Sequence, residues 1–288
     1  MQLSSSKIRK IGIICQDDVN IVGHLLFNNY RKALQNYFKG STFKDVERTE
    51  QLDGLDYVFI VDEHFIPHTE VWKKDSFIQK VNDLNIKVLV FNFEKIYSSQ
   101  FPWNADHQNK LETFNNLIQL FSDIEDRKLK NGILNKQLLS KDTKLINNNK
   151  EKIEKAVFIG QANGSQYYRR QETLQQLKSD PAFRDRLDII VTDRKYTYQE
   201  YLDILSKYKY VINPLGTGDF LNLRFYEALE LGCIPIQQVT PSMLPHYKEL
   251  EFGLLLHDLS NAADKKFKKM NYYLEDFFEE IGLSNIVD

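Results

Sequence analysis

Short apolar runs that alternate with segments of helical spacing constrain the fold of this chain more than any other feature of its sequence. The first runs are residues 11–15 (IGIIC), 57–61 (YVFIV) and 87–91 (KVLVF). Runs of this kind suit parallel strands that are buried on both faces. Between them apolar residues recur at helical steps, at Leu26, Tyr30, Ala33 and Tyr37 and then at Phe77, Val81 and Leu84. This βαβ rhythm predicts an α/β fold.

The same rhythm starts again in the second half of the chain. Its apolar runs are residues 156–159 (AVFI), 189–191 (IIV), 210–213 (YVIN) and 233–236 (CIPI). Thr197 and Glu200 have the spacing of a capping box, which predicts a helix that begins there. Because 288 residues exceed the usual size of one small core, we expect two domains. The sequence therefore predicts two Rossmann-like α/β domains that face one cleft.

A domain boundary is expected near the middle of the chain. From Asn104, a candidate cap, apolar residues recur at three- and four-residue steps, which predicts one long amphipathic helix that closes the first domain. These residues are Leu111, Phe114, Leu117, Ile118, Phe121 and Ile124. The polar stretch 141–155 then loses this periodicity and is typical of a linker. We therefore expect an N-terminal domain over residues 1–140 and a C-terminal domain over residues 156–288.

Composition excludes several classes of protein. The formal net charge is −2, which gives no general field for nucleic acid, so no nucleic-acid partner is expected. Cys15 and Cys233 each lie in an apolar run, which speaks against a disulfide framework and favours a reducing compartment. Neither a signal peptide nor a membrane span is evident, so we expect a soluble cytoplasmic protein. The basic run 265–269 favours a solvated helix face, with peripheral membrane contact as the alternative.

Two loops stand where ligands bind in open α/β sheets, beyond the carboxyl ends of the strands. The first contains Gly160 and Gly164 and leads into a helix with Arg169 and Arg170. Glycines let backbone N–H groups approach an anion, and a helix N-terminus and arginine side chains attract phosphate. The loop therefore indicates phosphate binding, with an ordinary glycine turn beside two surface arginines as the alternative.

The second loop follows the strand that ends at Asn213. Gly216 lies in the turn, and Asn222 is placed to cap a short helix that ends near Gly232. On this helix Arg224 and Glu227 are three residues apart and share one face, while Phe225, Ala228 and Leu229 can face the core. An arginine for phosphate and a carboxylate for ribose hydroxyls would suit a nucleoside diphosphate. The alternative is a surface ion pair of little consequence.

The second loop and its helix also carry a family resemblance. The segments PLGTGD (214–219) and NLRFYEALELGCIPI (222–236) resemble the donor-site signature of GT-B glycosyltransferases, particularly the exostosin-like group. The resemblance implies that Arg224 binds the diphosphate and Glu227 the ribose. It also implies that the Gly160 loop, with Arg169 or Arg170, closes over the phosphates. The further candidate substrate-binding residues are Gly164, Asn213, Gly216, Asn222 and Phe225. Asn222 stands where the group often has serine.

Other residues are candidates for the chemistry itself. No Asp-x-Asp triplet occurs, which argues against paired carboxylates that hold a divalent ion, so neither a metal nor another cofactor is expected. The cluster Asp62, Glu63 and His64 is the first candidate for a general base, with Asp17 and Asp18 second. Solvated loop residues are the alternative in both places. A metal site built from the histidines near Pro67 is rejected because proline spoils a ligand-bearing helix. Trp103 is a candidate for stacking on a sugar ring.

The sequence therefore predicts a metal-independent glycosyltransferase. Its donor would be UDP- or GDP-linked, and its acceptor a glycan, a lipid-linked glycan or a protein. A non-catalytic relative that binds a nucleotide or glycan is one alternative. A sugar-nucleotide epimerase with the same two-domain plan is the other.

Overall fold

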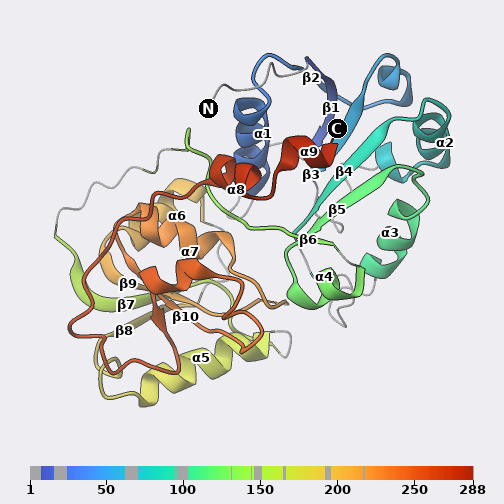
Figure 1. Cartoon of the computed structure of the whole chain (residues 1–288). Coiled ribbons are helices and arrows are strands. Elements are labelled where there is room, and N and C mark those ends of the chain that lie inside the picture. The colour runs from blue at the N-terminus through green and yellow to red at the C-terminus, as the bar shows by residue number, and fades with distance from the viewer. Residues whose placement is uncertain are drawn as a thin grey trace.

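The computed structural model describes residues 8–15, 25–61, 71–93, 95, 103–130, 132–143, 145, 151–164, 167–191, 196–216 and 218–287. Its strands form two separate sheets, all of whose pairings are parallel. Each sheet is covered by helices, and the two sheets with their helices lie side by side (Figure 1). We call the sheet built from residues 10–134 and its helices the first unit, and the sheet built from residues 153–255 and its helices the second unit.

The first sheet has the spatial order β2 (Thr42–Asp45), β1 (Lys10–Cys15), β3 (Tyr57–Val61), β4 (Lys87–Asn92), β5 (Leu117–Phe121) and β6 (Ile133–Leu134). Alternate strand residues serve the two faces, as in β3. Phe59 packs in the same cluster as α1 (Leu25–Tyr37), whereas Val58 and Ile60 pack with α2 (Asp75–Asp83) and α3 (Trp103–Leu111). Apolar residues on both faces of the strands explain the continuous apolar runs in the sequence.

The second sheet has the spatial order β11 (Leu254–Leu255), β10 (Ile234–Gln237), β9 (Tyr208–Asn213), β7 (Ile153–Ile159) and β8 (Leu187–Ile190). On one face, α5 (Tyr168–Ser179) packs through Leu174 and Leu177. On the other lie α6 (Tyr198–Leu205) and α7 (Leu223–Glu230). Two helix-covered parallel sheets confirm the predicted pair of Rossmann-like domains.

The long helix predicted from Asn104 is wrong. The structure has α3, then strand β5 and then α4 (Ile124–Lys130) in its place. Thr113 and Asn115 lie in the turn that ends α3, and β5 pairs with β4 from Leu117 opposite Val88 onward. The apolar residues counted as one helical stripe divide between two cores, because Leu111 and Phe114 pack on one face of the sheet and Leu120 and Ile124 on the other. Residues on opposite faces of a sheet cannot form one helix face.

The end of the chain returns to the first unit. Helices α8 (Leu274–Glu280) and α9 (Leu283–Val287) lie beside α1, shown in red and blue in Figure 1. Phe278 packs edge-on against Tyr30 of α1, with ring centroids 6.2 Å apart, and the Lys87 ammonium donates to the Val287 carbonyl at 2.7 Å. Helices α8 and α9, which belong to the predicted C-terminal domain, therefore pack against the first unit and complete its core. The division at residues 140 and 156 stays a prediction.

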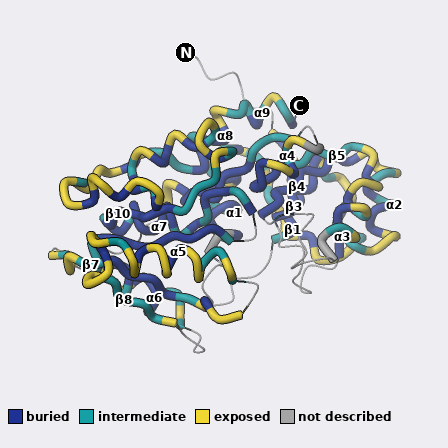
Figure 2. The backbone as a smooth tube through the Cα atoms, turned by 90° about the horizontal axis from the view of Figure 1, so that it is seen from below, coloured by how far each residue is buried: buried dark blue, intermediate teal, exposed yellow. Residues whose placement is uncertain are grey.

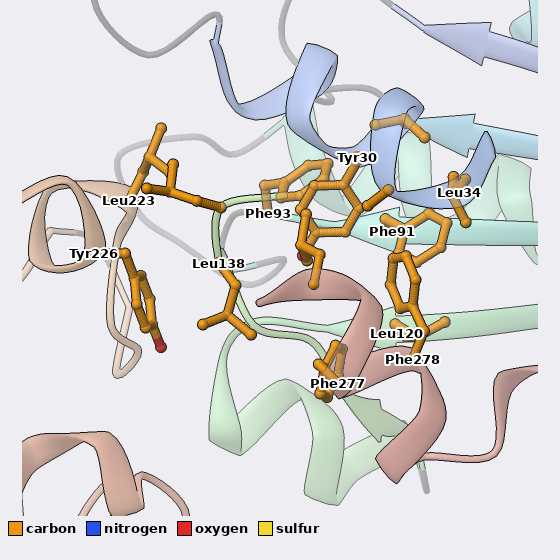
Figure 3. Packing of buried hydrophobic residues seen from close by; sticks show 14 of the residues in the cluster. Tyr30, Leu34, Phe91, Phe93, Leu120, Leu138, Leu223, Tyr226, Phe277 and Phe278 are labelled. Atoms are coloured by element: carbon orange, nitrogen blue, oxygen red, sulfur yellow. The ribbon is translucent and has the colours of Figure 1, made fainter. Parts of the chain in front are cut away.

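The two units share one apolar core. Leu223 and Tyr226 of α7 belong to the same buried cluster as Tyr30 and Phe93 of the first unit, and Leu138 of the connecting segment lies between them (Figure 3). The central strands of both sheets, such as β3, β4, β9 and β10, are largely buried, while the outward turns of α2 and α5 are exposed (Figure 2). Continuous apolar packing fixes the units against each other.

A buried ion pair lies within this shared core. The Lys136 ammonium is 2.8 Å from a carboxylate oxygen of Glu249, and their side chains are only 5% and 1% exposed. The ammonium also lies 5.2 Å from the centre of the Tyr272 ring. Lys136 comes from the segment that connects the units, and Glu249 from the 3₁₀ helix η4 (Lys248–Phe252) of the second unit.

The basic run 265–269 is not helical, which corrects the expectation of a helix face. It lies in an irregular segment, where Lys265 donates to the Glu251 carbonyl at 2.8 Å and Lys268 pairs with the Glu251 carboxylate at 3.6 Å. In the described residues, no helix combines the length and apolar character needed to span a bilayer.

Candidate functional site

The strand order of the second sheet identifies a topological switch point. Strands β7 and β9 are neighbours, but the sheet grows from β7 to β8 in one direction and from β9 to β10 in the other. The connections that leave β7 and β9 therefore reach helices on opposite faces, α5 and α7, and open α/β sheets bind ligands in the crevice between such connections. The two loops singled out in the sequence, after Ile159 and after Asn213, are these connections.

Gly160 and Arg224 bring the two loops together. Gly160 has φ +147°, a conformation that favours glycine, and a Cβ atom built on it would lie 3.5 Å from an Nη atom of Arg224. The Arg224 guanidinium also lies 5.5 Å from the centre of the Phe158 ring. The arginine on α7 thus reaches across to the end of β7, and glycine leaves room beside its charged group.

Arg224 is held on one edge. Asn222 caps α7 as predicted, and its side-chain oxygen accepts the Arg224 backbone N–H at 3.1 Å. The Arg224 Nε–H donates to the Tyr201 hydroxyl at 3.1 Å. Within the described part of the chain, the two Nη groups have no hydrogen-bond or ion-pair partner. The guanidinium is therefore anchored through Nε and keeps its Nη donors for a further acceptor.

Glu227 is enclosed by hydroxyl groups. It is 2% exposed, and its two carboxylate oxygens accept hydrogen bonds from Tyr198 at 2.8 Å and from Tyr201 at 3.0 Å. Burial raises the pKa of the carboxyl group, while the bonds from Tyr198 and Tyr201 and the charge of Arg224 oppose that rise. Arg224 and Glu227 are close, as predicted, but they are linked through Tyr201, whose hydroxyl accepts from Arg224 and donates to Glu227. Glu227 has no solvent-facing side on which a ribose contact would be evident.

Arg169 and Arg170 are each engaged by protein groups. Arg169 pairs with the Asp219 carboxylate at 3.1 Å. Burial disfavours its charge, but its hydrogen bond with Tyr168 and the Asp219 charge outweigh this and raise its pKa. Arg170 donates to the Gln161 carbonyl at 2.9 Å and lies 4.6 Å from the Tyr167 ring centre. Both arginines therefore fasten the Gly160 loop and α5 to their surroundings, and their predicted phosphate contacts stay predictions.

Asp219 marks where the second loop meets the first unit. Its backbone N–H donates to the buried Asp123 carboxylate at 2.8 Å, and that carboxylate also accepts the Glu125 N–H at the start of α4. A Cβ atom at Gly218 would lie 2.6 Å from Asp123, so only glycine allows this approach. Asp123 follows β5 closely and Asp219 follows β9. The carboxyl ends of both sheets therefore point to a common region.

The remaining second-loop candidates differ in surroundings. Asn213 is buried at the end of β9, and its amide donates to the Gln237 side chain, while its Oδ1 atom has no partner among the described residues. Gly216 is half-buried, with open space where a Cβ would stand. Gly164 is exposed, with φ +106°. Phe225 is fully buried in the shared core, which corrects its assignment as a substrate-binding residue, because a side chain without solvent access cannot touch a ligand there.

The candidates for the general base lie outside the described residues. These are Asp62, Glu63 and His64, which follow β3 in the sequence, and Asp17 and Asp18, which follow β1. The rejected histidine site near Pro67 and the Trp103 side chain are also outside. Across the residues that are described, no group of three or more His, Cys, Asp or Glu side chains is arranged to hold a metal ion.

Sequence reasoning missed Tyr198, Tyr201, Asp123 and Asp219 as parts of this region. The tyrosines sit three apart on α6, which the capping box identifies, but no local pattern says that α6 lies against α7. Asp219 was within the recognised segment, yet its partners, Arg169 on α5 and Asp123 directly before α4, are remote in the sequence.

Comparisons with known proteins bear on the fold. No family model matches the sequence, and no curated protein matches it. Among solved structures, the chain is similar to an α1,3-fucosyltransferase with TM-score 0.52 and 13% identity, covering 100% of this chain and 92% of that one. It is also similar to an α1,3-fucosyltransferase with GDP-fucose, with TM-score 0.51 and 13% identity, covering 100% of this chain and 93% of that one. SsfS6, a glycosyltransferase from Streptomyces sp. SF2575, matches with TM-score 0.37 and 9% identity, covering 97% of this chain and 95% of that one. The likeness to the two fucosyltransferase structures, together with the two parallel sheets, shows the GT-B fold of two Rossmann-like domains.

Proposed function

We propose that this chain is a glycosyltransferase that moves a sugar from a UDP- or GDP-linked donor to a glycan, a lipid-linked glycan or a protein. In this proposal the second unit binds the donor, the first unit receives the acceptor, and no divalent cation takes part. GDP is the nucleotide we place first, because one structure of similar fold is an α1,3-fucosyltransferase with GDP-fucose.

The observation that carries the proposal is the placement of Arg224. One of its Nη groups lies beside Gly160, at the switch point between β7 and β9, and its Nε is already bonded to Tyr201. A guanidinium with two donors in one plane is suited to the oxygens of a diphosphate. A glycine beside it lets an anion approach the backbone. The arrangement therefore supports a nucleoside diphosphate as ligand.

The chemistry follows from the leaving group. When the sugar departs from a nucleoside diphosphate, negative charge grows on the diphosphate. Arg224 and the partial positive charge at the N-termini of α5 and α7 would stabilise that charge without a metal ion. Asp62, Glu63 and His64 remain our proposal for the base that activates the acceptor hydroxyl, because they follow β3 next to β1, the switch point of the first sheet.

Nucleotide binding tests this proposal. We expect GDP or UDP to raise the melting temperature of the wild type, with the same rise in EDTA, and Arg224→Ala to abolish the rise because the diphosphate loses its cationic partner. Arg184→Ala is the matched control, because Arg184 is exposed in the turn that leads into the amino end of β8, at the edge of the sheet opposite the carboxyl ends of the strands. Release of the nucleotide from a sugar donor, lost in Arg224→Ala, would distinguish an enzyme from a binding protein. No shift with any nucleoside diphosphate at about millimolar concentration would refute the proposal.

A further inference from the structure

The place of Glu227 raises a question about its role. It stands one helical turn from Arg224 on α7, beside the proposed diphosphate site, yet it is 2% exposed and both of its oxygens accept hydrogen bonds from tyrosines. The carboxylate could use its remaining lone pairs for a ribose only if the side chain became exposed, which would disturb the bonds from the two tyrosines. Leaving a buried hydroxyl group unpaired costs about 1–3 kcal/mol. The geometry therefore favours a role inside the protein.

Tyr201 links Glu227 to Arg224 in a fixed direction. A tyrosine hydroxyl has one proton, and Arg224 can only donate. The Tyr201 oxygen therefore accepts from Arg224 Nε at 3.1 Å while its proton goes to Glu227 at 3.0 Å. Tyr201 is buried, and the Arg224 guanidinium lies 5.9 Å from its ring centre. This chain of two hydrogen bonds sets the orientation of the Nε edge of the guanidinium.

Tyr198 completes the enclosure of the carboxylate. It lies three residues before Tyr201 on α6 and donates to the other Glu227 oxygen at 2.8 Å. The two tyrosine rings are 6.1 Å apart and tilted by 32°. Among the described interactions Tyr198 has no contact with Arg224. Both tyrosines therefore bond to Glu227, and only Tyr201 also bonds to Arg224.

We propose that Glu227 is a positioning residue, which orients Tyr201 so that its hydroxyl holds the Nε edge of Arg224 and leaves the Nη edge turned toward Gly160 and the donor diphosphate. This inference rests on the proposed function and replaces the ribose contact implied by the family resemblance. Glu227 then acts on phosphate binding and not on recognition of the ribose hydroxyls.

The test compares two ligands and two matched substitutions. GDP carries the 2′ and 3′ hydroxyls of the ribose and 2′,3′-dideoxy-GDP lacks them, while both ligands carry the diphosphate. If the wild type prefers uridine, UDP and 2′,3′-dideoxy-UDP are used instead of the two guanosine ligands. Tyr201→Phe and Tyr198→Phe each remove one hydroxyl from the Glu227 carboxylate, which makes them a matched pair. Only Tyr201→Phe removes the bond to Arg224.

We expect Tyr201→Phe to weaken binding of both ligands about tenfold, the size of one hydrogen bond to a charged group, and Tyr198→Phe by less than about threefold. Glu227→Gln should weaken GDP and dideoxy-GDP by the same factor. If Glu227→Gln weakens only GDP, the carboxylate contacts ribose and the inference is overturned. Equal effects of Tyr201→Phe and Tyr198→Phe would also overturn it.

A measurement without ligand separates this inference from the proposed function. In the ¹⁵N spectrum, the Arg224 Nε–H should exchange slowly in the wild type and in Tyr198→Phe, and fast in Tyr201→Phe. A wild type that binds no nucleotide would refute the proposed function. Fast exchange in the wild type, or slow exchange in Tyr201→Phe, would refute the positioning of Arg224 whatever the ligand results.

Discussion

At the scale of single residues, Glu227 shows two effects acting against each other on one carboxyl group. Burial raises its pKa above the ordinary value of 4.5, because a charge in the interior loses its hydration. Hydrogen bonds from Tyr198 and Tyr201 and the charge of Arg224 favour the ionised form and lower the pKa. The net direction is upward, so burial is the larger effect.

This raised pKa predicts a pH dependence of stability. The folded state favours protonated Glu227, so its contribution to the free energy of unfolding is fully present below the ordinary pKa of 4.5 and is lost as the pH rises through the folded-state pKa. We expect wild type to lose stability relative to Glu227→Gln as the pH rises above about 4.5. Urea unfolding of both proteins across the acid-to-neutral range measures this. A difference that is constant with pH would contradict a raised pKa.

The residues on α7 were predictable only in part. Asn222 as the cap and Arg224 at the start of the helix follow from local spacing, and the structure confirms the cap. The hydroxyl groups around Glu227 come from residues 26 and 29 positions earlier, and no local pattern announces them. The burial of Phe225 was visible as a core-facing position on the same helix, and its inclusion among ligand contacts ignored that geometry.

At the scale of elements, the start of α6 matters for the site because the helix carries both tyrosines. The predicted capping box is confirmed, since Thr197 Oγ1 accepts the Glu200 N–H at 3.2 Å and Glu200 accepts the Thr197 N–H at 2.9 Å. Each bond satisfies a backbone donor that the first turn of a helix leaves unpaired.

We expect Thr197→Ala to lower the free energy of unfolding by about 1 kcal/mol, because the helix loses its side-chain cap. Chemical denaturation measures the loss. Thr197→Ser keeps the hydroxyl and should stay close to wild type. If the serine variant loses as much as the alanine variant, the methyl group and not the cap is responsible.

Strand prediction worked where strands are buried on both faces. Residues 57–61 were predicted as a strand and β3 occupies them, because five consecutive apolar residues suit no half-exposed element. The short edge strand β2 was missed, since its residues are largely exposed and polar. The strand β5 was taken for helix because its apolar residues continue the three- and four-residue steps of α3. The Asn115–Asn116 pair before it was the available signal of a turn.

At the scale of the whole molecule, the shared core predicts that both units unfold together. Lys136 and Glu249 form a buried pair across it. We expect Lys136→Met alone to cost about 3–5 kcal/mol, because it leaves Glu249 charged, buried and unpaired. The double variant Lys136→Met with Glu249→Met should recover most of that loss, since apolar residues can replace a buried pair.

Denaturant unfolding followed by tryptophan fluorescence and by circular dichroism tests this. Coincident single transitions are expected for wild type and for both variants. Two separate transitions would show that the units unfold independently, and losses that simply add in the double variant would show that Lys136 and Glu249 are not coupled.

The fold class was predictable because the βαβ rhythm occurs twice, and the return of the chain was not. Helix α8 has apolar residues at helical steps, at Leu274, Phe277 and Phe278, but nothing local says which surface covers it. Its partners lie far away in the sequence, as the bond from Asn36 to Glu275 at 3.1 Å illustrates. Contacts of this kind depend on how the two units are placed and not on spacing along the chain.

The position of α8 has a consequence for how the protein is made. Phe278 covers Tyr30 and Phe91, so the apolar layer over the first sheet stays open while the second unit is being synthesised. The first sheet therefore waits for a helix that is synthesised after the second sheet before its folding is complete, and until then α1 covers only part of that face.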